Sequence, residues 1–165
     1  MARSKEFLRC RDIDWAVKIG ANYIHVASAG GDLPKIVEDK LFDIWRELKN
    51  TEYVDSVVIL NESYLNEKFA NLNELDYEER DFRVKWYVLS FREMAKRGFY
   101  SFDRDIRTPI DDSKYRLVAK PERMKVIPNY NFPEINLLWT PEELDGQNIV
   151  ALIDEAEDRM QREKR

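Results

Sequence analysis

Alternating hydrophobic and polar residues near the start of the chain predict a β-hairpin over residues 13–28. Large apolar side chains occupy every second position on both sides of a short turn, which is the period expected for strands with one buried face. They are Ile13, Trp15, Val17 and Ile19 before the turn, and Ile24 and Val26 after it. Gly20-Ala21 fits a two-residue turn whose first position needs a positive φ. This turn pairs Val17 with Ile24, so all these apolar residues share one face.

The predicted register places His25, the only histidine, on the opposite face of the hairpin and across from Ala16. One interpretation is a general base oriented by Asp14. The other is a half-exposed strand histidine with a local hydrogen bond. We favour the second interpretation because the sequence offers no further catalytic partner.

Helical spacing of apolar residues predicts an amphipathic helix from Pro34 to about Lys49, which can cover the hairpin. The β-branched run Val54–Leu60 predicts an interior strand. A short helix around residues 64–72 and two short strands, Phe99–Asp103 and Lys114–Ala119, complete the middle of the chain. The last helix begins with the capping box Thr140-Pro141-Glu142-Glu143.

A long helix is predicted from Asp76, the N-cap, to Arg97, with Gly98 as the residue that follows its end. Its apolar residues form two stripes on nearly opposite sides. One stripe holds Val84, Tyr87, Val88, Phe91 and Ala95, and the other holds Phe82, Trp86 and Leu89. Two apolar stripes imply two packing partners, so we expect this helix to lie between the sheet and another helix or another chain.

Apolar residues also crowd the segment 128–139, where Pro128 and Pro133 disfavour a regular central strand. Together with the second stripe of the long helix, this segment predicts a protein–protein contact, with a partner protein or a second copy. The candidate binding residues are Phe82, Trp86, Leu89, Tyr130, Phe132 and Trp139. The alternative is that the segment wraps the long helix within one chain and leaves nothing exposed.

Composition and charge exclude several classes of protein. A chain of 165 residues favours a single domain, residues 1–165. The formal charge of −5 disfavours a nucleic-acid partner, even though a basic run extends from Lys114 to Lys125. Cys10 is the only cysteine, so no intramolecular disulfide forms. No apolar stretch approaches the roughly 18 residues of a membrane span, and we expect a cytoplasmic protein without membrane contact.

Carboxylates cluster in the loop 103–112, and hard cations prefer ligands of this kind. They are Asp103, Asp105, Asp111 and Asp112. Their spacing is not that of an EF-hand loop, and Arg104 and Arg107 offset the charge. We therefore favour a solvated acidic loop and assign no metal ligand, cofactor or catalytic residue.

These patterns predict an α+β fold: a mainly antiparallel sheet, started by the N-terminal β-hairpin, with three or four helices packed on it. The scarcity of catalytic motifs favours a non-enzymatic protein-binding or regulatory module. The alternative is a carboxylate-based, metal-dependent hydrolase that uses the acidic loop 103–112.

Overall fold

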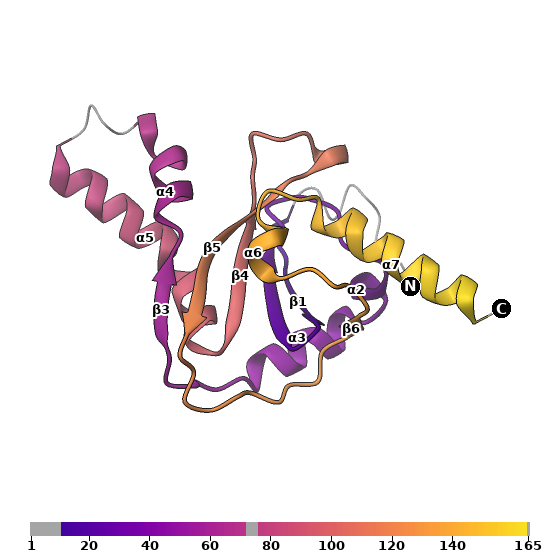
Figure 1. Ribbon diagram of the computed structural model, residues 1–165. Coiled ribbons are helices and arrows are strands. Elements are labelled where there is room, and N and C mark those ends of the chain that lie inside the picture. Colours follow the sequence, from indigo (N-terminus) through magenta and orange to yellow (C-terminus); the bar gives the residue numbers. More distant parts are fainter. Residues whose placement is uncertain (1–10, 72–75, 165) are drawn as a thin grey trace.

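The computed structural model describes residues 11–71 and 76–164, which form a six-stranded mixed sheet and six α-helices (Figure 1). In chain order the elements are β1 (Asp14–Ile19), β2 (Asn22–Ala27), α2 (Lys35–Asp39), α3 (Leu41–Lys49), β3 (Val57–Leu60), α4 (Glu62–Lys68), α5 (Tyr77–Lys96), β4 (Phe99–Arg104), the 3-10 helix η2 (Ile110–Asp112), β5 (Tyr115–Glu122), β6 (Glu134–Ile135), α6 (Pro141–Leu144) and α7 (Ile149–Glu163). Cys10 lies outside the described residues. No helix in the described part of the chain is both long and apolar enough to span a bilayer.

The strand order across the sheet is β3-β5-β4-β2-β1-β6. The neighbours β1–β2, β4–β5 and β3–β5 are antiparallel, whereas β2–β4 and β1–β6 are parallel. The prediction of a mainly antiparallel sheet was therefore wrong. The chain leaves β2, passes through the helices α2 to α5 and returns beside β2 in the same direction, and such long helical crossovers are what parallel pairing requires.

The count of three or four helices was also wrong, because two predicted helices are each broken into two. The helix predicted from Pro34 to Lys49 breaks at Lys40, whose φ of −116° and ψ of 19° depart from helical values. The C-terminal helix breaks at Gly146, which adopts a positive φ of 84°. The capping box at Thr140 therefore begins only the short α6, and Asn148 caps a separate α7.

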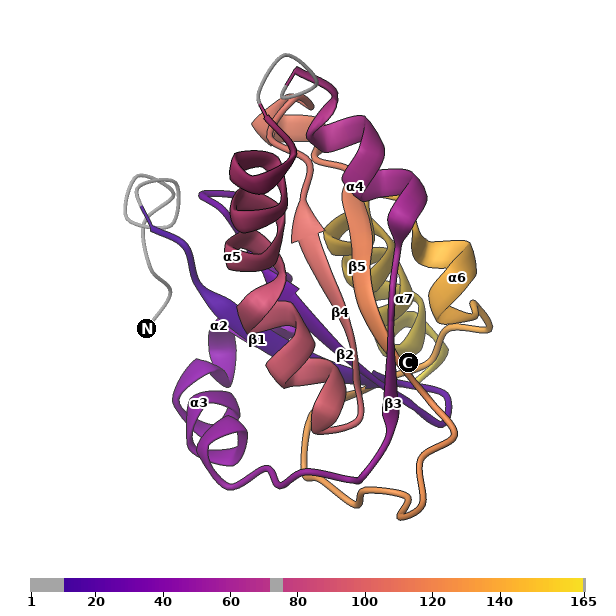
Figure 2. The same ribbon diagram turned by 90° about the vertical axis from the view of Figure 1, so that its left-hand side faces the viewer.

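The N-terminal hairpin has the predicted register, with Val17 opposite Ile24 and Trp15 opposite Val26. All four side chains are completely buried. The prediction that His25 is half-exposed was wrong, since only 2% of this residue is accessible. Both faces of the hairpin are covered, because helices pack on both sides of the sheet: α3 and α5 lie in front of it and α7 behind it in Figure 2.

The long helix α5 begins and ends as predicted. The Asp76 carboxylate accepts a hydrogen bond from the backbone N–H of Glu79 at 2.8 Å, and Gly98 follows the helix with a φ of 95°. The inner side of the helix buries Val88 and Phe91 against β4 and β5. One stripe of this helix is therefore part of the core.

The strand β3 lies at an edge of the sheet, not in its interior as the run Val54–Leu60 predicted. The regular strand begins only at Val57, which is 57% exposed. Val54 is buried, and its N–H donates to the carbonyl of Lys96 at the end of α5. Val54 is buried and Val58 packs against the core, while Val57 remains at the surface.

Candidate functional site

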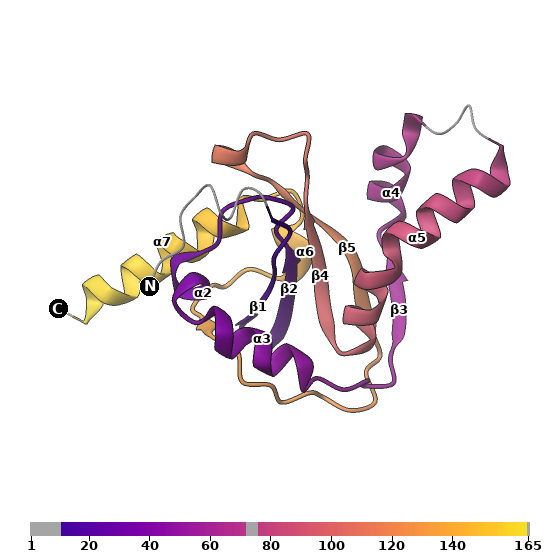
Figure 3. The same cartoon turned by 180° about the vertical axis from the view of Figure 1, so that it is seen from behind.

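The second stripe of α5 lies on the solvent side of the helix, and we call it the outer face of α5. It consists of Phe82, Trp86 and Leu89, which are 65%, 72% and 53% exposed. The rings of Phe82 and Trp86 stack with their centroids 6.5 Å apart and an angle of 18° between their planes. Figures 1 and 3 show that α4 and α5 occupy the side of the molecule opposite α7.

The spacing of these residues explains why they are exposed. Each residue of an α-helix turns by about 100°, so Phe82, Trp86 and Leu89 fall on one side of the helix. The buried Val88 and Phe91 lie on the opposite side of the helix and pack against the sheet. A helix that already contacts a sheet through one side cannot bury the other side against it, and no other described element covers the outer face.

Charged residues flank the outer face at both ends. Glu78 and Glu79 stand in the first turn of α5, and Lys96 stands in the last turn. At the C-terminal end, Glu93 accepts hydrogen bonds from the Tyr53 hydroxyl at 2.5 Å and the Lys96 ammonium at 3.2 Å. The bond from Tyr53, followed by that from Lys96, lowers the pKa of Glu93. Hydrogen bonds to Glu93 therefore hold the charged groups at the C-terminal end of the outer face in place.

The other three candidate binding residues lie on a different part of the molecule. Phe132 is only 5% exposed, and its ring contacts Tyr23 and Phe99 with centroid separations of 6.1 and 5.6 Å. Tyr130 stacks on Phe99 at 5.5 Å, and Trp139 is half-buried against the same core. The alternative that segment 128–139 wraps the outer face of α5 was wrong, because the segment covers the sheet instead.

A hydrogen-bond chain links the buried side chains of His25 and Ser101 to the exposed carboxylate of Asp14. His25 Nε2 lies 2.9 Å from Asp14 Oδ1, and His25 Nδ1 lies 2.7 Å from Ser101 Oγ. Burial acts to raise the pKa of Asp14, but the hydrogen bond and charge of His25 outweigh it and the pKa lies below its ordinary value.

Serine, histidine and aspartate are the residue types of a nucleophilic triad, but a nucleophile must reach its substrate. Ser101 is completely buried, and the Phe91 ring of α5 lies 6.4 Å from the His25 ring. The arrangement therefore functions as a polar network, buried at His25 and Ser101, that joins β1, β2 and β4. Sequence reasoning missed Ser101, because only the parallel pairing of β2 with β4 places it beside His25.

Three carboxylates of the acidic loop interact with separate groups. Asp103 accepts a hydrogen bond from the Tyr87 hydroxyl at 2.5 Å, and burial raises its pKa. Asp105 accepts three hydrogen bonds from Arg107, from the backbone N–H, Nε and a terminal nitrogen, and these side-chain bonds hold its pKa below the usual value. Asp112 bonds Lys114 at 3.2 Å. Among residues 11–71 and 76–164, no three His, Cys, Asp or Glu side chains are placed to hold a metal ion.

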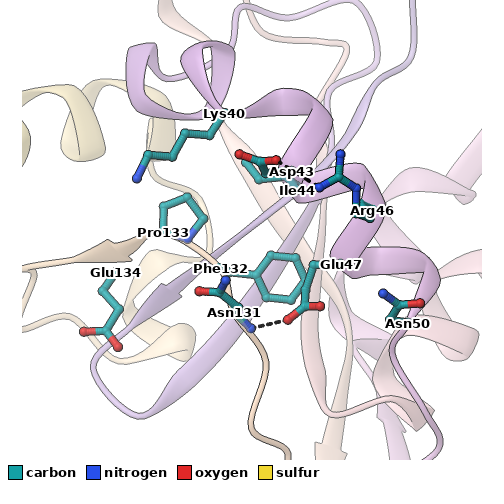
Figure 4. A pocket seen from close by; sticks show the side chains of 10 residues that line it. All are labelled: Lys40, Asp43, Ile44, Arg46, Glu47, Asn50, Asn131, Phe132, Pro133 and Glu134. Carbon is teal, nitrogen blue, oxygen red and sulfur yellow. Dashed lines mark hydrogen bonds and ion pairs between the residues drawn. The ribbon is translucent and has the colours of Figure 1, made fainter.

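A polar pocket of about 370 Å³ lies between α3 and residues 131–134 (Figure 4). Within it, Arg46 lies 3.6 Å from Asp43, and Glu47 accepts a hydrogen bond from the backbone N–H of Asn131. The Phe132 ring faces this opening from the core side. The pocket therefore has no set of converging polar groups directed at a ligand.

The geometry thus leaves the outer face of α5 as the strongest candidate site. Comparison with known proteins finds no match, whether among family models, curated protein sequences or solved structures.

Proposed function

We propose that this chain is a non-enzymatic protein-binding module and that the outer face of α5 is its binding surface. One observation carries the proposal: Phe82, Trp86 and Leu89 are more than half exposed and adjacent on one helix. The two aromatic side chains alone present roughly 300 Å² to solvent. Contiguous apolar patches of this size on soluble proteins are often functional, and buried aromatic side chains are the usual anchors of interfaces.

The proposal of a metal-dependent hydrolase at loop 103–112 has weaker support. Asp105 and Asp112 are neutralised by cationic neighbours, and Asp103 is bonded to Tyr87. A thermal-shift comparison with Ca²⁺, Mg²⁺ and Mn²⁺ tests this alternative, because a cation that binds the native state raises the melting temperature. The cytoplasmic location expected from the sequence stays part of our proposal, supported by the single cysteine among these 165 residues.

Photo-crosslinking tests the proposed binding surface. A benzophenone amino acid replaces Leu89 in the full chain, and the matched control carries it in place of Arg159, an exposed position on α7. Each protein is irradiated in an extract of the cells that produce it. We expect a defined adduct from position 89 that is absent from position 159. The same adducts from both positions, or none from position 89, would contradict the proposal.

A further inference from the structure

A groove of about 680 Å³ lies where α3 packs beside the start of β1 (Figure 2). It shares no residue with the outer face of α5 or with the polar pocket of Figure 4. Its apolar wall consists of Ile13, Trp45 and Leu48, and four charged residues complete the lining: Arg11, Asp12, Asp14 and Lys49. An apolar wall with a few polar groups is the usual composition of a site for a small molecule.

Two groups of this groove, the carboxylate of Asp14 and the ring of Trp45, are held in place. The indole N–H of Trp45 donates a hydrogen bond to the backbone carbonyl of Asp14 at 2.9 Å. The buried His25 contacts Asp14 Oδ1 at 2.9 Å, and Ser101 in turn contacts His25. The Asp14 side chain nevertheless remains 63% exposed, so a carboxylate in a fixed position lines the groove.

Of the four charged residues, two already have partners and two are open to a ligand. Asp12 Oδ1 accepts a hydrogen bond from a backbone N–H at 3.0 Å, and Arg11 also interacts within the chain. By contrast, the Lys49 side chain has no ion pair with any residue in the described part of the chain, and Asp14 uses only Oδ1 in the hydrogen-bond chain. Lys49 follows Trp45 by one helical turn, about 6 Å along α3. One negative and one positive group therefore stand beside the same indole ring.

We propose that this groove binds an α-amino acid with a large apolar side chain. The ammonium group of such a zwitterion pairs with Asp14 and its carboxylate with Lys49, while its side chain packs on Trp45. A simple amine would have Lys49 as a repulsive neighbour, and a simple acid would have Asp14 in the same role, so a ligand that carries both charges matches the lining best. The inference goes beyond the proposed function, because it concerns a different surface and a small-molecule ligand.

NMR titration of the ¹⁵N-labelled full chain with L-phenylalanine tests the inference. The four tryptophans give four indole N–H resonances, and Trp45→Phe identifies that of Trp45. We expect phenylalanine to shift the Trp45 resonance with a dissociation constant on the order of 1 mM, as its small size allows. The resonance of Trp86 on α5 should not move. Phenethylamine, which lacks the carboxylate, and phenylpropanoate, which lacks the ammonium group, should each bind at least about tenfold more weakly.

Charge variants test the two contacts separately. Asp14→Asn keeps an oxygen for His25 but removes the charge, and Lys49→Met removes the ammonium group. Each should weaken phenylalanine binding at least about fivefold, and Lys49→Met should not weaken the binding of phenethylamine, which has no carboxylate. Asp43→Asn and Lys40→Met, at exposed positions outside the groove, are the matched controls and should have no effect.

A Trp45 resonance that phenylalanine does not move, or an analogue that binds as tightly as phenylalanine, would overturn the inference. Unchanged phenylalanine binding in the Lys49 variant would overturn it as well. The comparison of analogues uses the wild-type chain, so it decides the question even if Asp14→Asn weakens the fold. Crosslinking from position 89 decides the proposed function separately, since that position lies outside the groove.

Discussion

His25 Nδ1 lies 2.7 Å from Ser101 Oγ, and this contact joins two residues that are 76 positions apart in the chain. It connects β2 to β4 at the centre of the sheet, where the two strands are parallel. Asp14 on β1 extends the same hydrogen-bond chain to a third strand. Because a buried polar group without a partner is costly, this network favours one arrangement of the three strands over alternatives.

Replacing Ser101 with alanine should destabilise the protein by about 1–3 kcal/mol, because His25 Nδ1 would remain buried without its partner. Urea titration measures the free energy of unfolding. Ser90→Ala, at an exposed position of α5, is the control and should change it by less than about 0.5 kcal/mol. An unchanged stability in the Ser101 variant would mean that the network has no structural role.

A second prediction concerns the buried core of the N-terminal hairpin. Val17 is completely buried, so Val17→Ala should cost about 1–3 kcal/mol through lost burial and the cavity that remains. Val57→Ala removes the same atoms from an edge strand at a position that is 57% exposed, and it should cost much less. Equal effects of the two substitutions in a denaturant titration would contradict the assigned burial.

The two sides of α5 should respond differently to the loss of an aromatic ring. Phe91→Ala should cost about 3–5 kcal/mol, because its ring packs in the core. Trp86→Ala should leave the stability of the single chain nearly unchanged, since 72% of the residue is exposed. Thermal and urea unfolding at low protein concentration compare the two. A large loss of stability in the Trp86 variant would show that another part of the chain covers the ring.

Asp105 should make stability depend on pH in the acid range. The bonds from Arg107 hold its pKa below the ordinary value, so the folded state binds this proton more weakly than the unfolded state does. The stabilisation is therefore present above about pH 4 and is lost as the pH falls through the depressed pKa. Asp105→Asn should be less stable than the wild type at pH 7, with a difference that narrows steadily below pH 4 in urea titrations. A difference that stayed constant from pH 7 to pH 3 would contradict the assignment.

Local patterns along the chain were sufficient for the hairpin and for α5. The turn at Gly20 sets the register of β1 and β2, and the cap at Asp76 sets the start of α5. Contacts between distant segments could not be predicted in the same way. Nothing in the sequence near Ser101 indicates that β4 lies parallel to β2, and an apolar run such as 54–60 does not distinguish an edge strand from an interior one.

The candidate surface was only partly predictable for the same reason. The spacing of Phe82, Trp86 and Leu89 showed that they occupy one side of the helix. Tyr130 and Phe132 were also predicted to form a binding surface. In the structure they instead complete the core around Tyr23. The sequence alone does not distinguish these core residues from the exposed aromatic residues of α5, because the difference depends on how segment 128–139 packs on the sheet.

Fluorine NMR of the chain labelled with 5-fluorotryptophan tests the role of the outer face of α5 most directly. The four tryptophans give four resonances, and Trp86→Phe identifies that of Trp86. At low concentration we expect the Trp86 resonance to show the largest shift between H₂O and D₂O, and Trp15, which is fully buried, to show none. In the presence of the partner captured by crosslinking from position 89, the Trp86 resonance alone should lose this solvent shift, because the partner covers the ring. A Trp86 resonance without a solvent shift in the dilute sample, or one that keeps its full shift when the partner is bound, would contradict the proposed binding surface.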